Sequence, residues 1–182
     1  VNSEHTGPLC LSDHSVEFVL SRPRIIPAGS MFDYHDGNPQ LISYAIQHRY
    51  GKPLADFAGE YLFKPLGITD WLWESSPDGI SFGAFSLYLK PRDMAKIGQM
   101  LIQNGQWKGM HIVDSNWIDI ATQPHQAYLP YWAYGYYFWI SPTEDIFYYN
   151  ASGHGGQMII VVPEKNLVIV SSAWPYSKHE EP

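Results

Sequence analysis

Cysteine, basic side chains and long apolar runs are all scarce in this sequence of 182 residues. The single cysteine, Cys10, excludes an intrachain disulfide and a zinc site built on paired thiols. The 11 Lys and Arg residues, set against 18 Asp and Glu, give a formal charge of −7, and they form no basic run. Because such a chain repels phosphate backbones, we expect no nucleic-acid partner.

The longest apolar stretch covers residues 158–162 and resumes at 167–170, so it falls well short of the ~20 residues that span a bilayer. We therefore expect no membrane span. The chain starts at Val1 without a basic-then-apolar leader, which indicates a processed or truncated start. Aromatic residues, in contrast, make up 15% of the sequence, and with this length they predict an ordinary globular domain rather than disorder.

The signatures of several common sites are also missing. The eight histidines include no His-Glu-x-x-His motif and no pair at His-x-x-x-His spacing beside a carboxylate, so we expect no metal and no cofactor. No Gly-x-Gly-x-x-Gly follows a predicted strand, which argues against a dinucleotide site. The Gly-x-Ser-x-Gly turn of α/β hydrolases does not occur either.

The period of the apolar residues changes along the chain. Helical spacing predicts helices over residues 39–50, 53–63 and 90–104, and a short one that starts at Asp114 or Ser115 and stops before Pro124. β-rich bursts with short connections then predict antiparallel strands at 134–140, 146–151, 156–162 and 167–173.

The last two predicted strands are apolar along most of their length, so we expect both faces of this hairpin to be covered, with helices on at least one side. The fold class is therefore α+β. A helical region, residues 1–130, is followed by an antiparallel sheet portion of the same domain, residues 131–182.

Two segments are candidates for chemistry. Residues 27–37 are rich in turn formers and deliver Tyr34 just before a predicted helix, although a Tyr that only packs is the simpler interpretation for one of 13 tyrosines. Residues 152–157 place three glycines and His154 at the start of a strand, where a ligand can approach the backbone closely. A tight turn with an exposed His is the alternative interpretation.

Together with four further segments, these two resemble serine hydrolases of the β-lactamase-related superfamily, over about residues 15–175. The chain is most similar to the branch of class C β-lactamase-like esterases and 6-aminohexanoate-dimer hydrolase-like amidases. The segments occur in the family's order: Pro27-x-Gly29-x-x-Phe32-x-Tyr34, Gly51-Lys52-Pro53-Leu54, Pro65-Leu66-Gly67, Arg92-Asp93-Met94-Ala95-Lys96-Ile97-Gly98, Asn104-Gly105-x-Trp107-x-Gly109 and Gly153-His154-Gly155-Gly156-Gln157.

This resemblance implies a β-lactamase/transpeptidase-like fold and an acyl-transfer serine hydrolase. Its substrate would be a small-molecule ester, amide or β-lactam that reacts through an acyl-enzyme, and its location would be periplasmic or secreted. The aromatic residues Tyr131, Trp132, Tyr134, Tyr136 and Tyr137 would suit an apolar acyl or linear amide group, although they are equally expected in a core.

The family combines three motifs, namely Ser-x-x-Lys, Tyr-x-Asn/Ser and Lys-Thr-Gly or His-x-Gly. Tyr34 matches the second motif, and the resemblance makes it a proton-transfer group if nearby cations lower its pKa from about 10. His154, with Gly155 and Gly156, matches the third motif and would donate a hydrogen bond to Tyr34 or to a substrate carboxylate. The Gln157 N–H would be the second oxyanion donor. We expect the Tyr34 hydroxyl and the His154 side chain to lie within roughly 8 Å of each other.

Two features depart from the family pattern. Asp36 stands where Asn or Ser is usual, and its charge would oppose a developing oxyanion. No Ser-x-x-Lys occurs, and the nearest misses are Ser21 with Arg24 and Ser86 with Lys90. The resemblance implies that this motif and the first strands lie upstream of Val1. The isolated chain would then be inactive, with an open sheet edge that pairs with that segment or with another copy. A non-catalytic binding or interaction module is the alternative.

Overall fold

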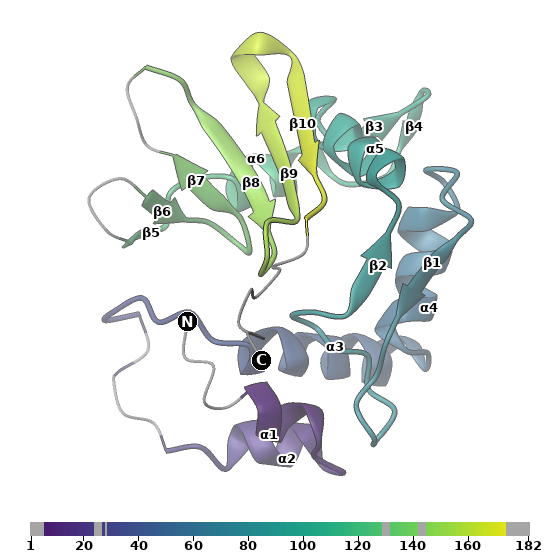
Figure 1. Cartoon of the computed structure of the whole chain (residues 1–182), viewed down its shortest axis with the longest axis vertical. Coiled ribbons are helices and arrows are strands. Elements are labelled where there is room, and N and C mark those ends of the chain that lie inside the picture. The colour runs from purple at the N-terminus through teal and green to yellow at the C-terminus, as the bar shows by residue number, and fades with distance from the viewer. Residues whose placement is uncertain (1–5, 24–26, 28, 129–131, 142–144, 174–182) are drawn as a thin grey trace, which may run out of the picture. The chain divides into compact units, whose positions relative to one another are not determined.

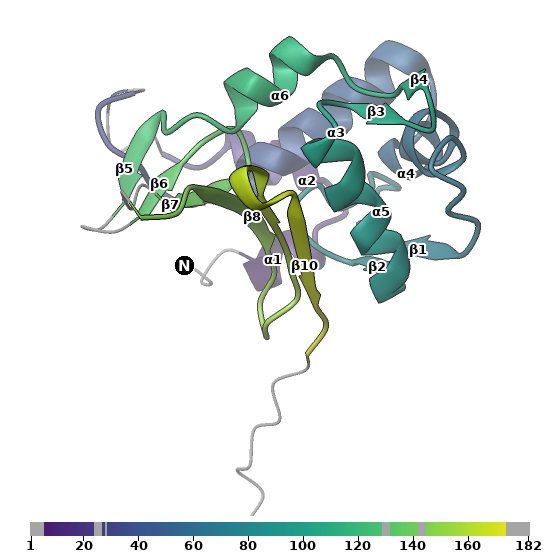
Figure 2. The same ribbon diagram turned by 90° about the horizontal axis from the view of Figure 1, so that it is seen from above.

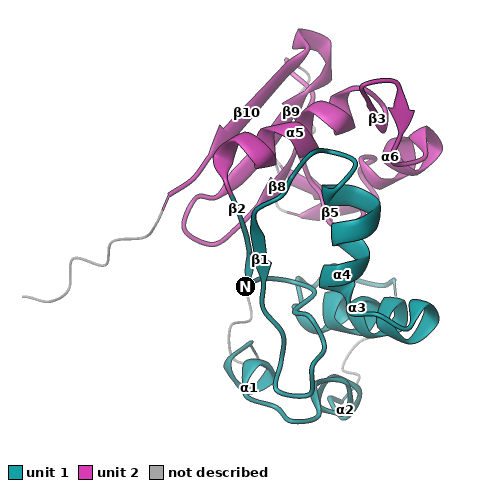
Figure 3. Ribbon diagram, turned by 90° about the vertical axis from the view of Figure 1, so that its right-hand side faces the viewer, with its two compact units in different colours: residues 1–89 teal, residues 90–182 magenta. Residues whose placement is uncertain are grey.

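The computed structural model describes residues 6–23, 27, 29–128, 132–141 and 145–173 (Figure 1). The chain divides into two compact units, residues 1–89 and residues 90–182 (Figure 3), and each has buried apolar side chains of its own. Whether both act as one catalytic domain, as predicted for residues 1–130 and 131–182, stays a prediction. No helix in the described ranges is long and apolar enough to cross a membrane.

The first unit is mainly helical, and a short antiparallel hairpin ends it. Its buried apolar side chains include Phe63, Leu66 and Ile80. The elements are α1 (Thr6–Cys10), α2 (Ser15–Leu20), α3 (Gly37–Tyr50), α4 (Leu54–Ala58), η1 (Gly59–Phe63), β1 (Trp71–Trp73) and β2 (Leu87–Leu89).

The second unit holds a six-stranded antiparallel sheet in the order β10-β9-β8-β7-β6-β5, so each strand pairs with its neighbour in sequence (Figure 1). The elements are α5 (Pro91–Ile102), β3 (Gln106–Trp107), β4 (Met110–His111), α6 (Ser115–Ala121), β5 (Gln126–Tyr128), β6 (Trp132–Tyr134), β7 (Trp139–Ser141), β8 (Tyr148–Ser152), β9 (Met158–Val162), η2 (Pro163–Lys165) and β10 (Leu167–Ser171). The α+β class is therefore confirmed.

The predicted helices are present, and local signals account for their ends. α3 ends at Gly51, whose φ of +69° is left-handed and whose N–H donates to Gln47 O at 2.8 Å. α6 begins after Asp114, whose side chain accepts a hydrogen bond from the Asn116 N–H at 2.8 Å. The helix predicted over residues 53–63 consists of α4 followed by the π-helical turn η1.

The final hairpin has the predicted antiparallel arrangement. β9 and β10 pair over five residues, from Leu167 opposite Val162 to Ser171 opposite Met158. Helix α5 packs on one face of these strands, as Figure 2 shows. On the other face of β10, the described residues leave Leu167 and Ile169 with 43% and 45% of their surface exposed. The expectation that both faces are covered is therefore wrong for β10.

The prediction of one strand over residues 134–140 is also wrong, because this segment contains the end of β6, a turn and the start of β7. The Gly135 N–H closes the turn on Phe138 O at 2.9 Å, and Tyr137 adopts a left-handed φ of +65°. A Cβ at Gly135 would lie 2.1 Å from Ala121 O, so only glycine fits against α6 at this position. Aromatic residues occupy the turn, and because aromatic residues favour strands, the sequence predicts a continuous strand here.

Two glycines of the second unit allow the destabilisation caused by backbone strain to be distinguished from that caused by a steric clash. Gly105 and Gly109 both have a φ of +82°, but a Cβ at Gly105 would lie 1.9 Å from Val113 O, whereas a Cβ at Gly109 meets nothing within 4 Å. We expect Gly109→Ala to lower the free energy of unfolding by about 1 kcal/mol through strain alone. Gly105→Ala should lower it by a further ~1–3 kcal/mol, because the Val113 backbone must move.

Urea unfolding of both variants, monitored by circular dichroism, measures this difference directly. Equal loss of stability in the two variants would contradict the steric argument.

Candidate functional site

The first candidate segment leads directly into α3, in the first unit. Tyr34 and His35 precede α3, and Asp36 is the residue at its N-cap. Asp36 does not cap the helix with its side chain. Its Oδ2 instead accepts a hydrogen bond from Thr6 Oγ1 at 2.5 Å, which ties α1 to the start of α3. The negative charge of Asp36 is thereby engaged within the first unit.

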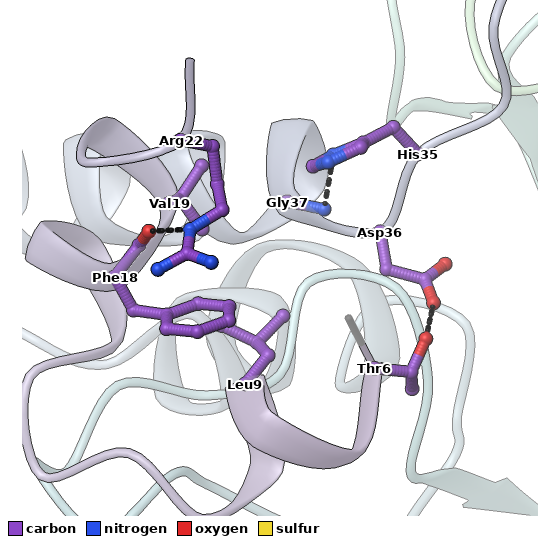
Figure 4. A pocket seen from close by; sticks show the side chains of 8 residues that line it. All are labelled: Thr6, Leu9, Phe18, Val19, Arg22, His35, Asp36 and Gly37. Atoms are coloured by element: carbon purple, nitrogen blue, oxygen red, sulfur yellow. Dashed lines mark hydrogen bonds between the residues drawn. The ribbon is translucent and has the colours of Figure 1, made fainter. Parts of the chain in front are cut away.

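A small pocket lies beside this segment, between α1, α2 and the start of α3 (Figure 4). His35 lies against Gly37 and accepts that residue's backbone N–H at Nδ1, at 2.9 Å. Arg22 donates from Nε to Phe18 O at 3.2 Å, and its guanidinium lies 4.3 Å from the centre of the Phe18 ring. Tyr34 does not line the pocket, whose lining residues are Thr6, Leu9, Phe18, Val19, Arg22, His35, Asp36 and Gly37.

Tyr34 is half-buried, and its environment within the first unit favours the protonated hydroxyl. Burial raises the pKa of Tyr34 above its ordinary value of 10, and the negative charge of Asp36 raises this pKa further. The resemblance requires the opposite direction, a pKa lowered by nearby cations. Burial and the charge of Asp36 therefore set the direction of the pKa shift of Tyr34 in this structure.

The second candidate segment is the tight turn between β8 and β9, in the second unit. Gly155 and Gly156 have φ values of +92° and +93°, which side-chain-bearing residues rarely adopt. The Gly153 N–H donates to Gln157 O at 2.8 Å and closes the turn. His154 is exposed at its tip. Gly155 and Gly156 therefore have a structural reason, and the turn also presents an imidazole to solvent.

Gln157 is anchored through its side chain. Its Nε2 donates to Ala173 O at 2.5 Å, and a Cβ at Gly156 would lie 3.3 Å from the Cβ of Ala173. The turn is thus fastened to the chain that follows β10. Within the described residues, no hydrogen-bond acceptor is found for the backbone N–H of Gln157, the expected oxyanion donor.

The six residues predicted for the site therefore form two groups. His154, Gly155, Gly156 and Gln157 are brought together in one turn, whereas Tyr34 and Asp36 lie at the start of α3 in the other unit. The predicted separation of less than roughly 8 Å between Tyr34 and His154 joins the two units and stays a prediction. In the described ranges, no group of three or more His, Cys, Asp or Glu could hold a metal ion.

Sequence reasoning missed Thr6 as the partner of Asp36. The two residues are 30 positions apart, and no local pattern connects them. Of the aromatic residues considered for substrate contact, Tyr131 lies outside the described residues. Tyr136 stacks with Trp117 and His125, with ring centres 5.6 and 4.3 Å away.

The family model for Beta-lactamase matches residues 3–173, nearly the whole chain. The protein therefore belongs to the Beta-lactamase family and has the β-lactamase/transpeptidase-like fold, as its sequence motifs predict. No match was found among the curated proteins.

Solved structures agree on the fold. One is a protein from Bacillus anthracis provisionally assigned as a 6-aminohexanoate-dimer hydrolase, with 24% identity, a TM-score of 0.76, and coverage of 87% of this chain and 42% of that one. The octameric penicillin-binding protein homologue from Pyrococcus abyssi has 18% identity, a TM-score of 0.69, and coverage of 96% and 48%. A D-stereospecific amidohydrolase from Streptomyces sp. has 13% identity, a TM-score of 0.64, and coverage of 90% and 56%. The chain thus spans about half the length of these proteins.

Asp36→Asn tests the charge that acts on Tyr34. The amide keeps an oxygen that accepts from Thr6 but removes the negative charge, so the pKa of Tyr34 should fall. Burial is the larger cause and remains, so this pKa should not fall below its ordinary value. NMR titration of tyrosine labelled with ¹³C at Cζ measures the shift, with Tyr34→Phe identifying the signal.

The matched control is Asp33→Asn, which removes an exposed charge next to Tyr34 in sequence. An equal shift in both variants would show that Asp36 has no special effect on Tyr34.

Proposed function

We propose that this chain is part of an acyl-transfer serine hydrolase that acts on a small-molecule ester, amide or β-lactam through an acyl-enzyme. The observation that carries the proposal is that one family match contains both the Tyr34 segment and the His154 turn. The chemistry of both segments is consistent with it. One supplies a phenol for proton transfer, and the other supplies hydrogen-bond donors at an exposed glycine turn.

Tyr34 is the proton-transfer group in this proposal. In the environment of the first unit it keeps its proton at neutral pH, and so it can donate to a leaving group. To accept the proton of an attacking serine, it needs a cation close by that outweighs burial and Asp36. The lysine of a Ser-x-x-Lys segment is the cation that the family pattern provides.

His154 and Gln157 act on the substrate side. The exposed imidazole of His154 donates a hydrogen bond to Tyr34 or to a substrate carboxylate. The Gln157 backbone N–H donates to the oxyanion, and one donor of this kind typically contributes about 3–4 kcal/mol to transition-state stabilisation. The left-handed glycines before Gln157 hold that amide at the start of β9.

The serine nucleophile lies outside this chain in the proposal. The 182 residues contain no Ser-x-x-Lys. Four serines of the first unit are also too inaccessible to attack a substrate, since at most 4% of their surface is exposed and hydrogen bonds hold them in place. They are Ser15, Ser43, Ser76 and Ser81.

The isolated chain should therefore show neither labelling by a fluorophosphonate nor hydrolysis of nitrocefin or p-nitrophenyl acetate above background. Intact mass spectrometry after incubation with the phosphonate measures the labelling. Stoichiometric labelling of this chain would identify one of its own serines as the nucleophile and overturn the proposed location.

A chimera tests the role of Tyr34. The N-terminal segment of the Bacillus anthracis relative, if it carries Ser-x-x-Lys, is fused ahead of Val1, and labelling of that serine is expected. Tyr34→Phe should then slow acylation by about 10²–10⁴-fold. Tyr44→Phe, which changes an exposed Tyr of α3, should leave the rate unchanged. Equal rates for Tyr34→Phe and the parent chimera would remove Tyr34 from the mechanism.

The missing Ser-x-x-Lys favours one second candidate, a non-catalytic binding module that keeps the pocket. This candidate predicts that the chimera stays unlabelled while the 182-residue chain binds a β-lactam or a short amide reversibly. Isothermal titration calorimetry with benzylpenicillin and with 6-aminohexanoate dimer separates the two functions.

A further inference from the structure

The side chain of Gln157 connects the His154 turn to the segment that follows β10. Its Nε2 donates to the carbonyl oxygen of Ala173 at 2.5 Å, across 16 positions of sequence. Because a carbonyl oxygen only accepts hydrogen bonds, the amide nitrogen has to face Ala173, and Oε1 points away from it. Oε1 lies close to Gly153, since a Cβ at that position would be 3.1 Å from it. The side-chain amide is therefore held between Gly153 and Ala173.

Two glycines of the turn leave the space that the Gln157 side chain and Ala173 occupy. A Cβ at Gly153 would lie 3.1 Å from Gln157 Oε1 and 3.4 Å from Gln157 Cβ, and a Cβ at Gly156 would lie 3.3 Å from Ala173 Cβ. Gly153 does not have a left-handed φ, in contrast to Gly155 and Gly156. Room for the Gln157 side chain is therefore the reason that the structure gives for a glycine at position 153.

The backbone of Gln157 is held from a second direction. The Gly153 N–H donates to Gln157 O at 2.8 Å, so both the carbonyl and the side chain of Gln157 are bound. The preceding residues, Gly155 and Gly156, restrict the backbone less than any other residue type would. Without the two bonds, the peptide group that carries the Gln157 N–H could therefore rotate more freely. The bond to Ala173 thus acts on the orientation of this N–H.

We propose that Gln157 is a positioning residue, whose side-chain bond to Ala173 holds its own backbone N–H in one orientation toward the substrate. The role in catalysis rests on the proposed function, which makes this N–H the oxyanion donor, whereas the effect on its orientation does not. A donor that is already oriented needs no reorganisation when charge develops on the substrate oxygen. The side-chain amide acts only through the backbone, because its Nε2 is engaged with Ala173.

¹⁵N relaxation of the 182-residue chain measures the orientational order of the Gln157 N–H directly. In Gln157→Leu, which cannot donate to Ala173, the order parameter of the N–H at position 157 should fall from about 0.85, the value of a rigid backbone, toward about 0.6. Gln126→Leu is the matched control, because Gln126 is an exposed glutamine at the start of β5 in the same unit. An order parameter that is equal in Gln157→Leu, in Gln126→Leu and in the parent chain overturns the proposal.

Gln157→Glu tests the hydrogen bond without a change of shape. An ionised carboxylate only accepts hydrogen bonds and is repelled by Ala173 O, whereas a protonated carboxyl can donate to it. The order parameter at position 157 should therefore be low at pH 7 and should recover near pH 4, where a glutamate with an ordinary pKa of about 4.3 is largely protonated. The parent chain, measured at both pH values, subtracts any effect of His154, the titratable residue of the turn. Because one variant provides both states, this comparison holds even if Gln157→Leu does not fold. A low order parameter that does not recover, or no loss at pH 7, overturns the proposal.

The chimera with an N-terminal Ser-x-x-Lys segment tests the consequence for catalysis. Gln157→Leu should slow acylation by the phosphonate about 10–100-fold, which is less than the loss of a whole oxyanion donor, with little change in the concentration that gives half the maximal rate. Equal rate constants for Gln157→Leu and Gln126→Leu would overturn the catalytic role. A chimera that is not labelled at all contradicts the proposed function instead, and the order parameters still decide whether Ala173 orients the N–H.

Discussion

The close approach of α5 to β9 and β10 depends on the missing side chain at Gly98. A Cβ at this position would lie 2.5 Å from Val168 Cγ1 and 3.0 Å from Ile159 Cγ2, so any other residue would push the helix away from the sheet. The contact fixes which face of the sheet becomes the core of the second unit. It also positions the His154 turn, because that turn leads directly into β9. The same choice of face leaves Leu167 and Ile169 exposed on the other side of β10.

A buried amide has a comparable role in the first unit. Gln40 is 1% exposed, donates to Ser15 Oγ at 3.2 Å, and accepts the Gly83 N–H at 3.1 Å. These bonds connect α3 to α2 and to the loop before β2. Because a buried polar group without a partner costs about 1–3 kcal/mol, the network favours one position for α3. Tyr34 and Asp36 immediately precede that helix, so the network also limits where they can lie.

The sequence predicts what local chemistry decides. Gly51 and Asp114 mark helix ends, and the glycines around His154 mark a turn, because capping and left-handed φ values depend on adjacent residues. The apolar pattern of α3 was less informative. Its buried face holds Gln40 and Ser43, whereas Ile42 is 46% exposed, because a polar network replaces apolar packing there.

Contacts between residues that are far apart in the sequence cannot be predicted from local patterns. The hydrogen bond from Thr6 to Asp36 joins residues 30 positions apart, and no periodic pattern in the sequence predicts it. The hairpin at residues 134–140 was missed because Tyr136 and Tyr137 occupy a turn that Gly135 makes possible by packing against α6. For the site, the motifs identified both segments, but the separation of Tyr34 and His154 depends on how two compact units are arranged, which local patterns do not encode.

The charge around Tyr34 links the missing nucleophile to the missing proton acceptor. The pKa of a phenol is ordinarily about 10, and it must fall by roughly three units before the group accepts a proton readily at neutral pH. A shift of this size corresponds to about 4 kcal/mol. Burial and Asp36 both act in the wrong direction. Arg22, the cation that lines the pocket beside Asp36, is engaged with the carbonyl and the ring of Phe18. A cation close to Tyr34 has to outweigh both of these effects. In the proposed enzyme the lysine of Ser-x-x-Lys would supply it, so the segment that carries the attacking hydroxyl would also create the base that activates it.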